Sequence, residues 1–164
     1  MSRAGGRRPP FEPEPRTARV APANPSITVD SIRAMLRESA PSYPQALAIE
    51  PVEIDDERSV GSLVVEEIHL HPGKQVHGGV WVGLADTVAA WQTFRHLPDG
   101  ASFTTIELKL NAFAAAGLGD RLTATAEHLH AGRSTHVIEV RVDRDDRFAA
   151  NLLVTQFVIA DQLR

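Results

Sequence analysis

The sequence contains no cysteine, few aromatic residues and no long apolar run. The absence of cysteine excludes a disulfide scaffold, a thiol nucleophile and a cysteine-ligated metal, and it fits the reducing cytoplasm, where we expect the protein to reside. No stretch reaches the roughly 18 apolar residues of a membrane span, and residues 1–20 lack the apolar segment of a signal peptide. The net charge of −4 argues against a nucleic-acid-binding protein. We therefore expect neither nucleic acid nor a membrane among its partners.

What the sequence does contain is one domain, preceded by a stretch of different composition. Its 164 residues, 43% of them hydrophobic and 23% charged, suffice for one core and are too few for two ordinary domains. Residues 1–25 hold six prolines, and five arginines against two glutamates. Such a stretch buries too little apolar surface to offset the entropy cost of ordering it. We expect a flexible N-terminal arm over residues 1–25 and a single domain over residues 26–164.

Hydrophobic periodicity predicts a helix, two strands, a long helix and then four strands. Thr28 or Asp30 caps the first helix, and Pro41 stops it. The first two strands are expected over residues 45–54 and 59–70. After a loop over residues 71–79, the stretch 80–97 is too long for a strand and apolar nearly all round, which predicts a buried helix. The later strands are expected over residues 102–113, 121–130, 134–142 and 148–160.

These elements predict a two-layer α+β domain. Strands that follow one another through short turns pair antiparallel, and an apolar helix packs on such a sheet as a second layer. In the stretch 102–113, alternation places Leu108 and Leu110 on one face and Thr105 on the opposite face.

The long helix also predicts an assembly, because a helix that is apolar all round needs more cover than one sheet face provides. We therefore expect a homodimer. The large side chains of this helix that exceed the cover of one sheet are expected to be Trp81, Val82, Val88, Trp91 and Phe94.

Asp86 is the chemically unusual residue of that helix. Its neighbours three and four positions away, such as Val82 and Ala90, are small or apolar and cannot pair with a carboxylate. A buried carboxylate without a partner is costly, so it is either satisfied from another element or kept for function. Both interpretations stay open at this point.

The helix opens with the sequence His77-Gly78-Gly79. The two glycines leave the backbone N–H groups of the helix N-terminus unshielded, and such groups favour a developing negative charge. The oxyanion of a thioester carbonyl would fit there, although a plain turn is the alternative. The seven histidines contain no HExxH, and the sequence has no GxSxG, which disfavours a zinc site and a serine hydrolase.

The run from His77 to Asp86 resembles the signature of a known enzyme family. It reads HGGVWVGLAD and is similar to the HGG-x(4)-L-A-D motif of the hotdog-fold acyl-CoA thioesterases of the phenylacetate-degradation (PaaI) type. Residues 105–113, TIELKLNAF, resemble a strand motif of the same family. The likeness covers residues 28–160, and the HGG-to-Asp86 segment is its most specific part.

The resemblance implies a hotdog fold, in which an antiparallel sheet wraps around one long central helix, in dimers that often pair into tetramers. It implies hydrolysis of an acyl-CoA thioester to the free acid and CoA, without a cofactor or a metal. The Gly78 N–H would then polarise the thioester carbonyl, with Asp86 as general base or nucleophile. Thr105, supplied by the partner subunit, would help to place the water.

Five further residues complete the expected site. His77 and Gly79 belong to the same motif, and Arg121 and Arg133 are candidates for binding the CoA phosphates. His71 occupies the position six residues before the motif histidine, where the family usually has Asn or Gln. It can donate a hydrogen bond there or act as an acid or base.

Two other functions stay open. A hotdog dehydratase or hydratase uses a loop histidine and a carboxylate on the central helix, a pair that His71 and Asp86 imitate. A non-catalytic acyl-CoA-binding module is the second alternative, although such a module would not need a carboxylate at the centre of the helix.

Overall fold

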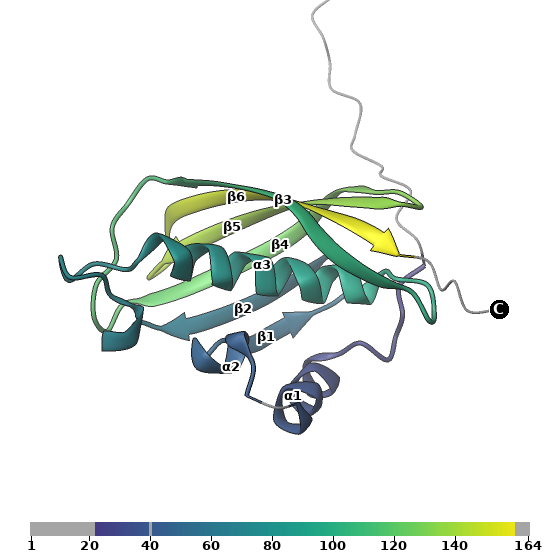
Figure 1. Ribbon diagram of the computed structural model, residues 1–164, viewed down its shortest axis with the longest axis horizontal. Coiled ribbons are helices and arrows are strands. Elements are labelled where there is room, and N and C mark those ends of the chain that lie inside the picture. The colour runs from purple at the N-terminus through teal and green to yellow at the C-terminus, as the bar shows by residue number, and fades with distance from the viewer. Residues whose placement is uncertain (1–21, 40, 160–164) are drawn as a thin grey trace, which may run out of the picture.

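The structure is a computed structural model that describes residues 22–39 and 41–159 (Figure 1). Its helices are α1 (Val29–Glu38), α2 (Tyr43–Ala46), the short 3-10 helix η1 (Glu67–His69) and the long α3 (Gly78–Arg95). Its strands are β1 (Glu50–Ile54), β2 (Arg58–Val64), β3 (Ser102–Ala112), β4 (Arg121–Ala131), β5 (Thr135–Arg144) and β6 (Arg147–Ile159).

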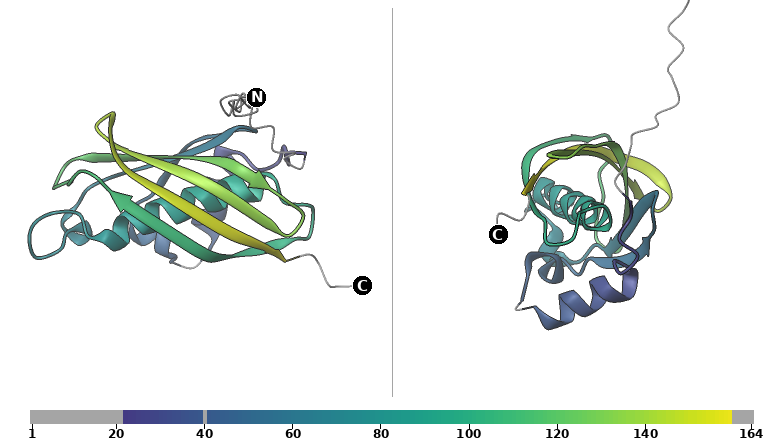
Figure 2. Two further views of the ribbon diagram at one scale, coloured as in Figure 1. Left: turned by 90° about the horizontal axis from the view of Figure 1, so that it is seen from above. Right: turned by 90° about the vertical axis from the view of Figure 1, so that its right-hand side faces the viewer.

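The strands form one antiparallel six-stranded sheet in the order β1-β2-β4-β5-β6-β3. The sheet curls around α3, as the right-hand view of Figure 2 shows, and β1 and β3 are its two edges. The predicted α+β class is therefore confirmed, with the sheet wrapped around one central helix. Across the described ranges, the chain has no helix of the length and apolarity that crossing a bilayer requires.

The first predicted strand, over residues 45–54, is only half correct. Its second half forms β1, whereas Tyr43–Ala46 form α2. Gln45 Oε1 accepts the Ser42 N–H over 2.7 Å, which closes a capping box, and Pro44 lies in the first turn, where its fixed backbone angle favours a helix. These local contacts outweigh the strand preference of the following apolar residues.

The second predicted strand, over residues 59–70, is too long, because β2 ends at Val64. The His69 ring is fully buried, and its Nδ1 accepts the Glu66 N–H over 2.8 Å. This side-chain contact turns the backbone into η1, and it ends the strand before residue 67.

Helix α3 is covered by its own chain more completely than its composition predicts. Trp81, Val88 and Trp91 are 3%, 0% and 2% exposed, so the expectation that they require a second chain is wrong. Gly61 of β2 permits this packing, because a Cβ there would lie 2.6 Å from Val88 and 2.7 Å from Trp91. Apart from residues at its two ends, α3 is half-buried only along a narrow stripe at four-residue spacing: Val82, Asp86, Ala90 and Phe94.

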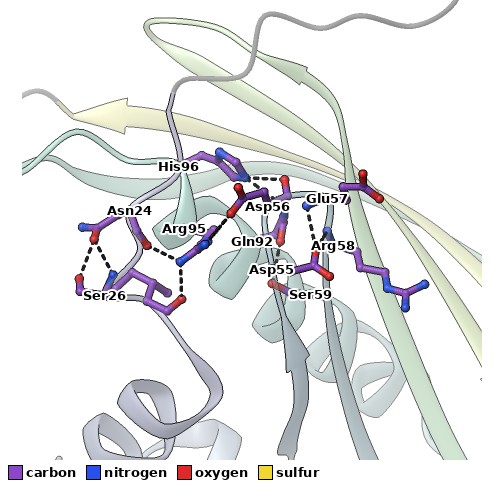
Figure 3. Close-up of polar contacts among 11 residues, drawn as sticks. Asn24, Ser26, Asp55, Asp56, Glu57, Arg58, Ser59, Gln92, Arg95 and His96 are labelled. Atoms are coloured by element: carbon purple, nitrogen blue, oxygen red, sulfur yellow. Dashed lines mark hydrogen bonds and ion pairs between the residues drawn. The ribbon is translucent and has the colours of Figure 1, made fainter.

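The C-terminal end of α3 is held by Arg95 (Figure 3). Its Nη1 donates to the carbonyl oxygens of Asn24 and Ile27 over 2.6 and 3.0 Å, and its Nε donates to Asp56 Oδ1 over 3.1 Å. A cation at this end also interacts favourably with the helix dipole. Residues 1–21 of the predicted N-terminal arm lie outside the described residues, whereas Asn24 contacts α3 through these bonds.

Candidate functional site

The N-terminus of α3 presents one exposed backbone donor. The His77 ring accepts the Gly79 N–H through Nδ1 over 2.9 Å, and the His77 carbonyl accepts the Val80 N–H over 2.9 Å. Within residues 22–39 and 41–159, no acceptor is hydrogen-bonded to the Gly78 N–H. Gly78 is exposed, and a Cβ on it would meet nothing within 4 Å, so the helix start is open to an approaching ligand here. Such a donor can bind an anion or a polarised carbonyl oxygen.

His71 lies in the turn that leads to this helix. Its backbone carbonyl accepts the Lys74 N–H over 2.9 Å, and its ring Nδ1 accepts the Gly73 N–H over 2.9 Å. A neutral imidazole that accepts through Nδ1 carries its proton on Nε2. His71 is therefore set to donate a hydrogen bond from Nε2.

Asp86 is half-buried in the middle of α3, and its partner comes from the sheet. Thr105 Oγ1 donates to Asp86 Oδ1 over 2.9 Å. Oδ2 has no hydrogen-bond partner among the residues that the structure describes. Asp86 thus has one oxygen held in place and one available on the half-buried stripe of α3.

The position of Thr105 corrects two expectations. The pairing of β3 with β6 shifts between Thr105 and Glu107, which marks a bulge at Ile106. The bulge turns Thr105 to the same inner face as Leu108, whereas strict alternation places them on opposite faces. The resemblance implied a hydroxyl from the partner subunit, whereas Thr105 reaches Asp86 within one chain.

Sequence reasoning missed Gln156 of β6, which lies beside this pair. Gln156 is fully buried, and its Nε2 donates to Thr105 Oγ1 over 3.5 Å. Its position in the alternation, between the buried Val154 and Val158, could have identified it as a polar residue in the core.

One chain does not bring all predicted residues together. Gly78 and Asp86 are eight positions apart on one helix, which corresponds to about 12 Å along its axis. A single carbonyl carbon cannot contact both. The chain therefore holds two half-sites: Asp86 with Thr105 at mid-helix, and His77, Gly78 and Gly79 at the helix start.

The two candidate arginines lie at opposite ends of the sheet. Arg121 begins β4. It lies at the end of the sheet where α3 starts, because the segment before it is bonded to residues that precede α3: Asp120 accepts the Val65 N–H, and Ala116 accepts the Val76 N–H. Arg133 follows β4 and lines a pocket with His96, the residue that caps the C-terminal end of α3. The ten steps from Arg121 to Ala131 span about 33 Å of strand.

A cluster of histidines lies at that same C-terminal end. His128 Nε2 and His136 Nδ1 are 3.1 Å apart, and the His96 ring packs edge-on against His128 at 5.0 Å. Burial lowers the pKa of His128 to about 3, and the neighbouring His136, His96 and His130 act in the same direction. Burial also lowers the pKa of His136 to about 4. In the described part of the chain, no three His, Asp or Glu side chains are arranged to hold a metal ion.

The regions in which known proteins resemble this chain include the residues of the candidate site. The family model described as the thioesterase superfamily matches residues 73–148, which include Gly78, Asp86 and Thr105. The protein PA1618 of Pseudomonas aeruginosa is 33% identical over 93 residues, a stretch that spans 56% of this chain and 63% of PA1618. The acyl-coenzyme A thioesterase PaaI of Escherichia coli is 33% identical over 99 residues, which span 60% of this chain and 68% of PaaI.

Solved structures share the architecture. The thioesterase HI1161 of Haemophilus influenzae superposes with a TM-score of 0.76 at 20% identity, over 84% of this chain and 94% of that one. A protein of Streptococcus pneumoniae described as a hypothetical thioesterase, whose crystal structure contains coenzyme A, superposes with a TM-score of 0.64 at 25% identity, over 70% and 88% of the two chains. The likeness confirms the predicted hotdog fold. With the family match and the PaaI relative, it shows that the chain belongs to the thioesterase superfamily.

Proposed function

We propose that this protein hydrolyses an acyl-CoA thioester to the free acid and CoA, with Asp86 as the catalytic carboxylate. The observation that carries the proposal is how the two carboxylate oxygens of Asp86 are placed. Oδ1 is held by the Thr105 hydroxyl, and Oδ2 lies on the half-buried stripe of α3. Oδ2 can therefore accept a proton from an attacking water, or attack the thioester carbon itself.

We further propose that the complete active site forms between two copies of the chain. The Gly78 N–H is a suitable donor for the thioester oxyanion, but it lies about 12 Å along the helix from Asp86. In a symmetric dimer, Gly78 of the partner subunit can lie opposite Asp86, and two equivalent sites result. The half-buried stripe of α3, with Val82 and Phe94, offers a surface for the second copy. Pairing of dimers into a tetramer and the cytoplasmic location stay predictions.

The acyl-CoA class is supported by the relatives. The Escherichia coli relative is named an acyl-coenzyme A thioesterase, and the Streptococcus pneumoniae structure contains coenzyme A. The phosphates of CoA need cationic partners. Arg121 is the candidate at the end where α3 begins, and Arg133 is the candidate at the other end. His77 and Gly79 stabilise the first turn of α3, because the His77 ring accepts the Gly79 N–H.

We assign His71 an orienting role. Its Nδ1 is engaged by the Gly73 N–H, so a neutral ring offers Nε2–H as a donor. A donor can orient a substrate carbonyl or a water. A dehydratase base would instead need an unprotonated nitrogen facing the substrate, so this contact favours hydrolysis over the dehydratase alternative.

A thiol-release assay tests the proposal. Wild-type protein is supplied with aromatic and aliphatic acyl-CoA thioesters, and free CoA is measured with a thiol reagent. We expect release from at least one thioester, and a loss of at least about 10²-fold in turnover for Asp86→Asn. Asn keeps the size of the side chain and can still accept the Thr105 hydrogen bond. Absence of release from every thioester, or full activity of Asp86→Asn, would contradict the proposal.

A further inference from the structure

We infer that Gln156 is a positioning residue for the catalytic carboxylate, acting through Thr105. The inference rests on the proposed function of Asp86. Four side chains form one hydrogen-bonded series from the core to the half-buried stripe of α3. Thr93 donates to Gln156 Oε1, Gln156 Nε2 donates to Thr105 Oγ1 over 3.5 Å, and Thr105 donates to Asp86 Oδ1 over 2.9 Å.

The direction of every bond in this series follows from its last member. An ionised carboxylate only accepts, so the single proton of the Thr105 hydroxyl must point to Asp86. Thr105 Oγ1 is then an acceptor toward Gln156, which requires the NH₂ group of Gln156 on that side. The Oε1 of Gln156 consequently faces Thr93, whose hydroxyl donates to it. Only one orientation of the amide satisfies all four groups.

The fold places these residues side by side. Thr105 and Gln156 are directly paired across β3 and β6, and the bulge at Ile106 follows immediately. Thr93 of α3 and Gln156 are both fully buried. A buried amide is costly unless it is hydrogen-bonded, and an apolar residue of similar size would fill this position without that cost. The amide is therefore explained by its two contacts together, which link Thr93 in the core to Thr105.

The consequence concerns the orientation of Asp86. A hydroxyl that accepts from Gln156 has its rotation restricted, so its proton stays directed at Oδ1. Without that donor, the Thr105 hydroxyl can turn away, and the carboxylate loses both a fixed position and a hydrogen bond that favours its charged form. Loss of Gln156 should therefore lower the rate of the chemical step and leave substrate binding nearly unchanged.

The test compares Gln156→Met with a matched control. Gln92 of α3 is also a fully buried amide, but its Oε1 accepts from Ser59 over 2.7 Å, in a separate set of contacts that does not include Asp86. We expect Gln156→Met to lower kcat about tenfold with little change in KM, and to move the acidic limb of the pH–rate profile to higher pH. Gln92→Met should lower the melting temperature but leave kcat and the pH–rate profile unchanged.

A double variant tests the route of the effect. Because Gln156 acts through Thr105, adding Gln156→Met to Thr105→Val should cause no further loss in kcat. The inference would be overturned if the double variant lost kcat by the product of the two single losses. It would also be overturned if Gln156→Met had the wild-type kcat and pH–rate profile. If Gln156→Met does not fold, the same measurements are made on Thr93→Val. A wild-type pH–rate profile of Thr93→Val would likewise overturn the inference. Wild type and Asp86→Asn are assayed in parallel, so failure of the proposed function is seen separately, as missing thiol release or an active Asp86→Asn.

Discussion

The Thr105 hydroxyl lies 2.9 Å from Asp86 Oδ1 and joins the edge strand β3 to the middle of α3. This contact holds one carboxylate oxygen, and among the residues that the structure describes the other oxygen has no hydrogen-bond partner. It also places the proposed catalytic carboxylate next to an edge of the sheet, where a second copy of the chain could pair with β3. The proposed chemistry and the proposed dimer thus depend on the same strand.

We predict that the hydroxyl of Thr105, rather than its bulk, supports turnover. Thr105→Val keeps the shape and removes the donor, and it should lower kcat by about tenfold, since hydrogen bonds to charged groups contribute roughly that much. Thr105→Ser retains the hydroxyl and serves as the control, with kcat close to wild type. Equal activities of the two variants, measured by thiol release, would show that the hydroxyl plays no part.

We predict that the protein loses stability in acid because of His128 and His136. Their folded-state pKa values, about 3 and about 4, lie below the ordinary value of 6.5. As the pH falls below 6.5, the unfolded state binds protons that the folded state does not. The free energy of unfolding should therefore decrease from pH 6.5 toward pH 4, by up to about 1.4 kcal/mol per pH unit for each ring, and be flat above pH 7.

Urea unfolding at a series of pH values measures this slope. His128→Phe preserves a ring at the site and removes the titrating group, so its slope below pH 6.5 should be smaller than that of wild type. His130 is exposed in the same strand and is the smallest contributor to the lowered pKa of both rings, so His130→Gln should change the slope much less than His128→Phe does. An identical slope in His128→Phe and wild type would remove His128 from the explanation.

We predict that Arg121→Ala raises KM for an acyl-CoA several-fold and leaves kcat nearly unchanged, because a phosphate contact remote from the thioester contributes to binding alone. The same acyl group on pantetheine, which lacks the nucleotide phosphates, should show no difference between variant and wild type. Arg133→Ala is assayed in the same way and tests the second candidate. An unchanged KM for acyl-CoA in either variant excludes that arginine from phosphate binding.

Much of this architecture could be predicted from the sequence, because its signals are local and periodic. The apolar stretch after Gly79 is α3, and Leu122, Ala124 and Ala126 of β4 alternate into the core as expected. Asp86 stands out because no neighbour on its own helix can pair with it. The SYPQ sequence at the start of α2 is a capping box, which predicts a helix there. The predicted strand over residues 45–54 should therefore have begun later.

The remaining errors concern the face of a strand on which a side chain lies, and they come from tertiary contacts that local sequence patterns do not predict. The bulge at Ile106 has neither glycine nor proline to mark it, and it reverses the face on which Thr105 lies. A second register shift between His128 and His130 has the same effect on β4: His128 continues the inward alternation, whereas His130, two residues later, is exposed. Strict alternation cannot predict either shift, because it depends on pairing with another strand.

We predict that the backbone N–H of Gly78, rather than the absence of a side chain at this position, serves catalysis. Gly78 is the first residue of α3, where proline is well tolerated, and a substituent there meets open space. Gly78→Pro removes the N–H and should lower kcat by about 10²-fold, as expected for loss of an oxyanion donor. Gly78→Ala keeps the N–H and is the control, with kcat close to wild type.

The two inactive variants together test whether the site is shared between subunits. In a hybrid dimer of Asp86→Asn and Gly78→Pro chains, one site combines an intact Gly78 with an intact Asp86, and the other site has both changes. Each hybrid dimer should therefore recover about half of the wild-type activity, although neither parent is active alone. If Gly78 and Asp86 instead acted from the same chain, every site in the hybrid would carry one defect and no activity would return. Co-expression of the two chains with different affinity tags, followed by sequential purification and the thiol-release assay, distinguishes these outcomes.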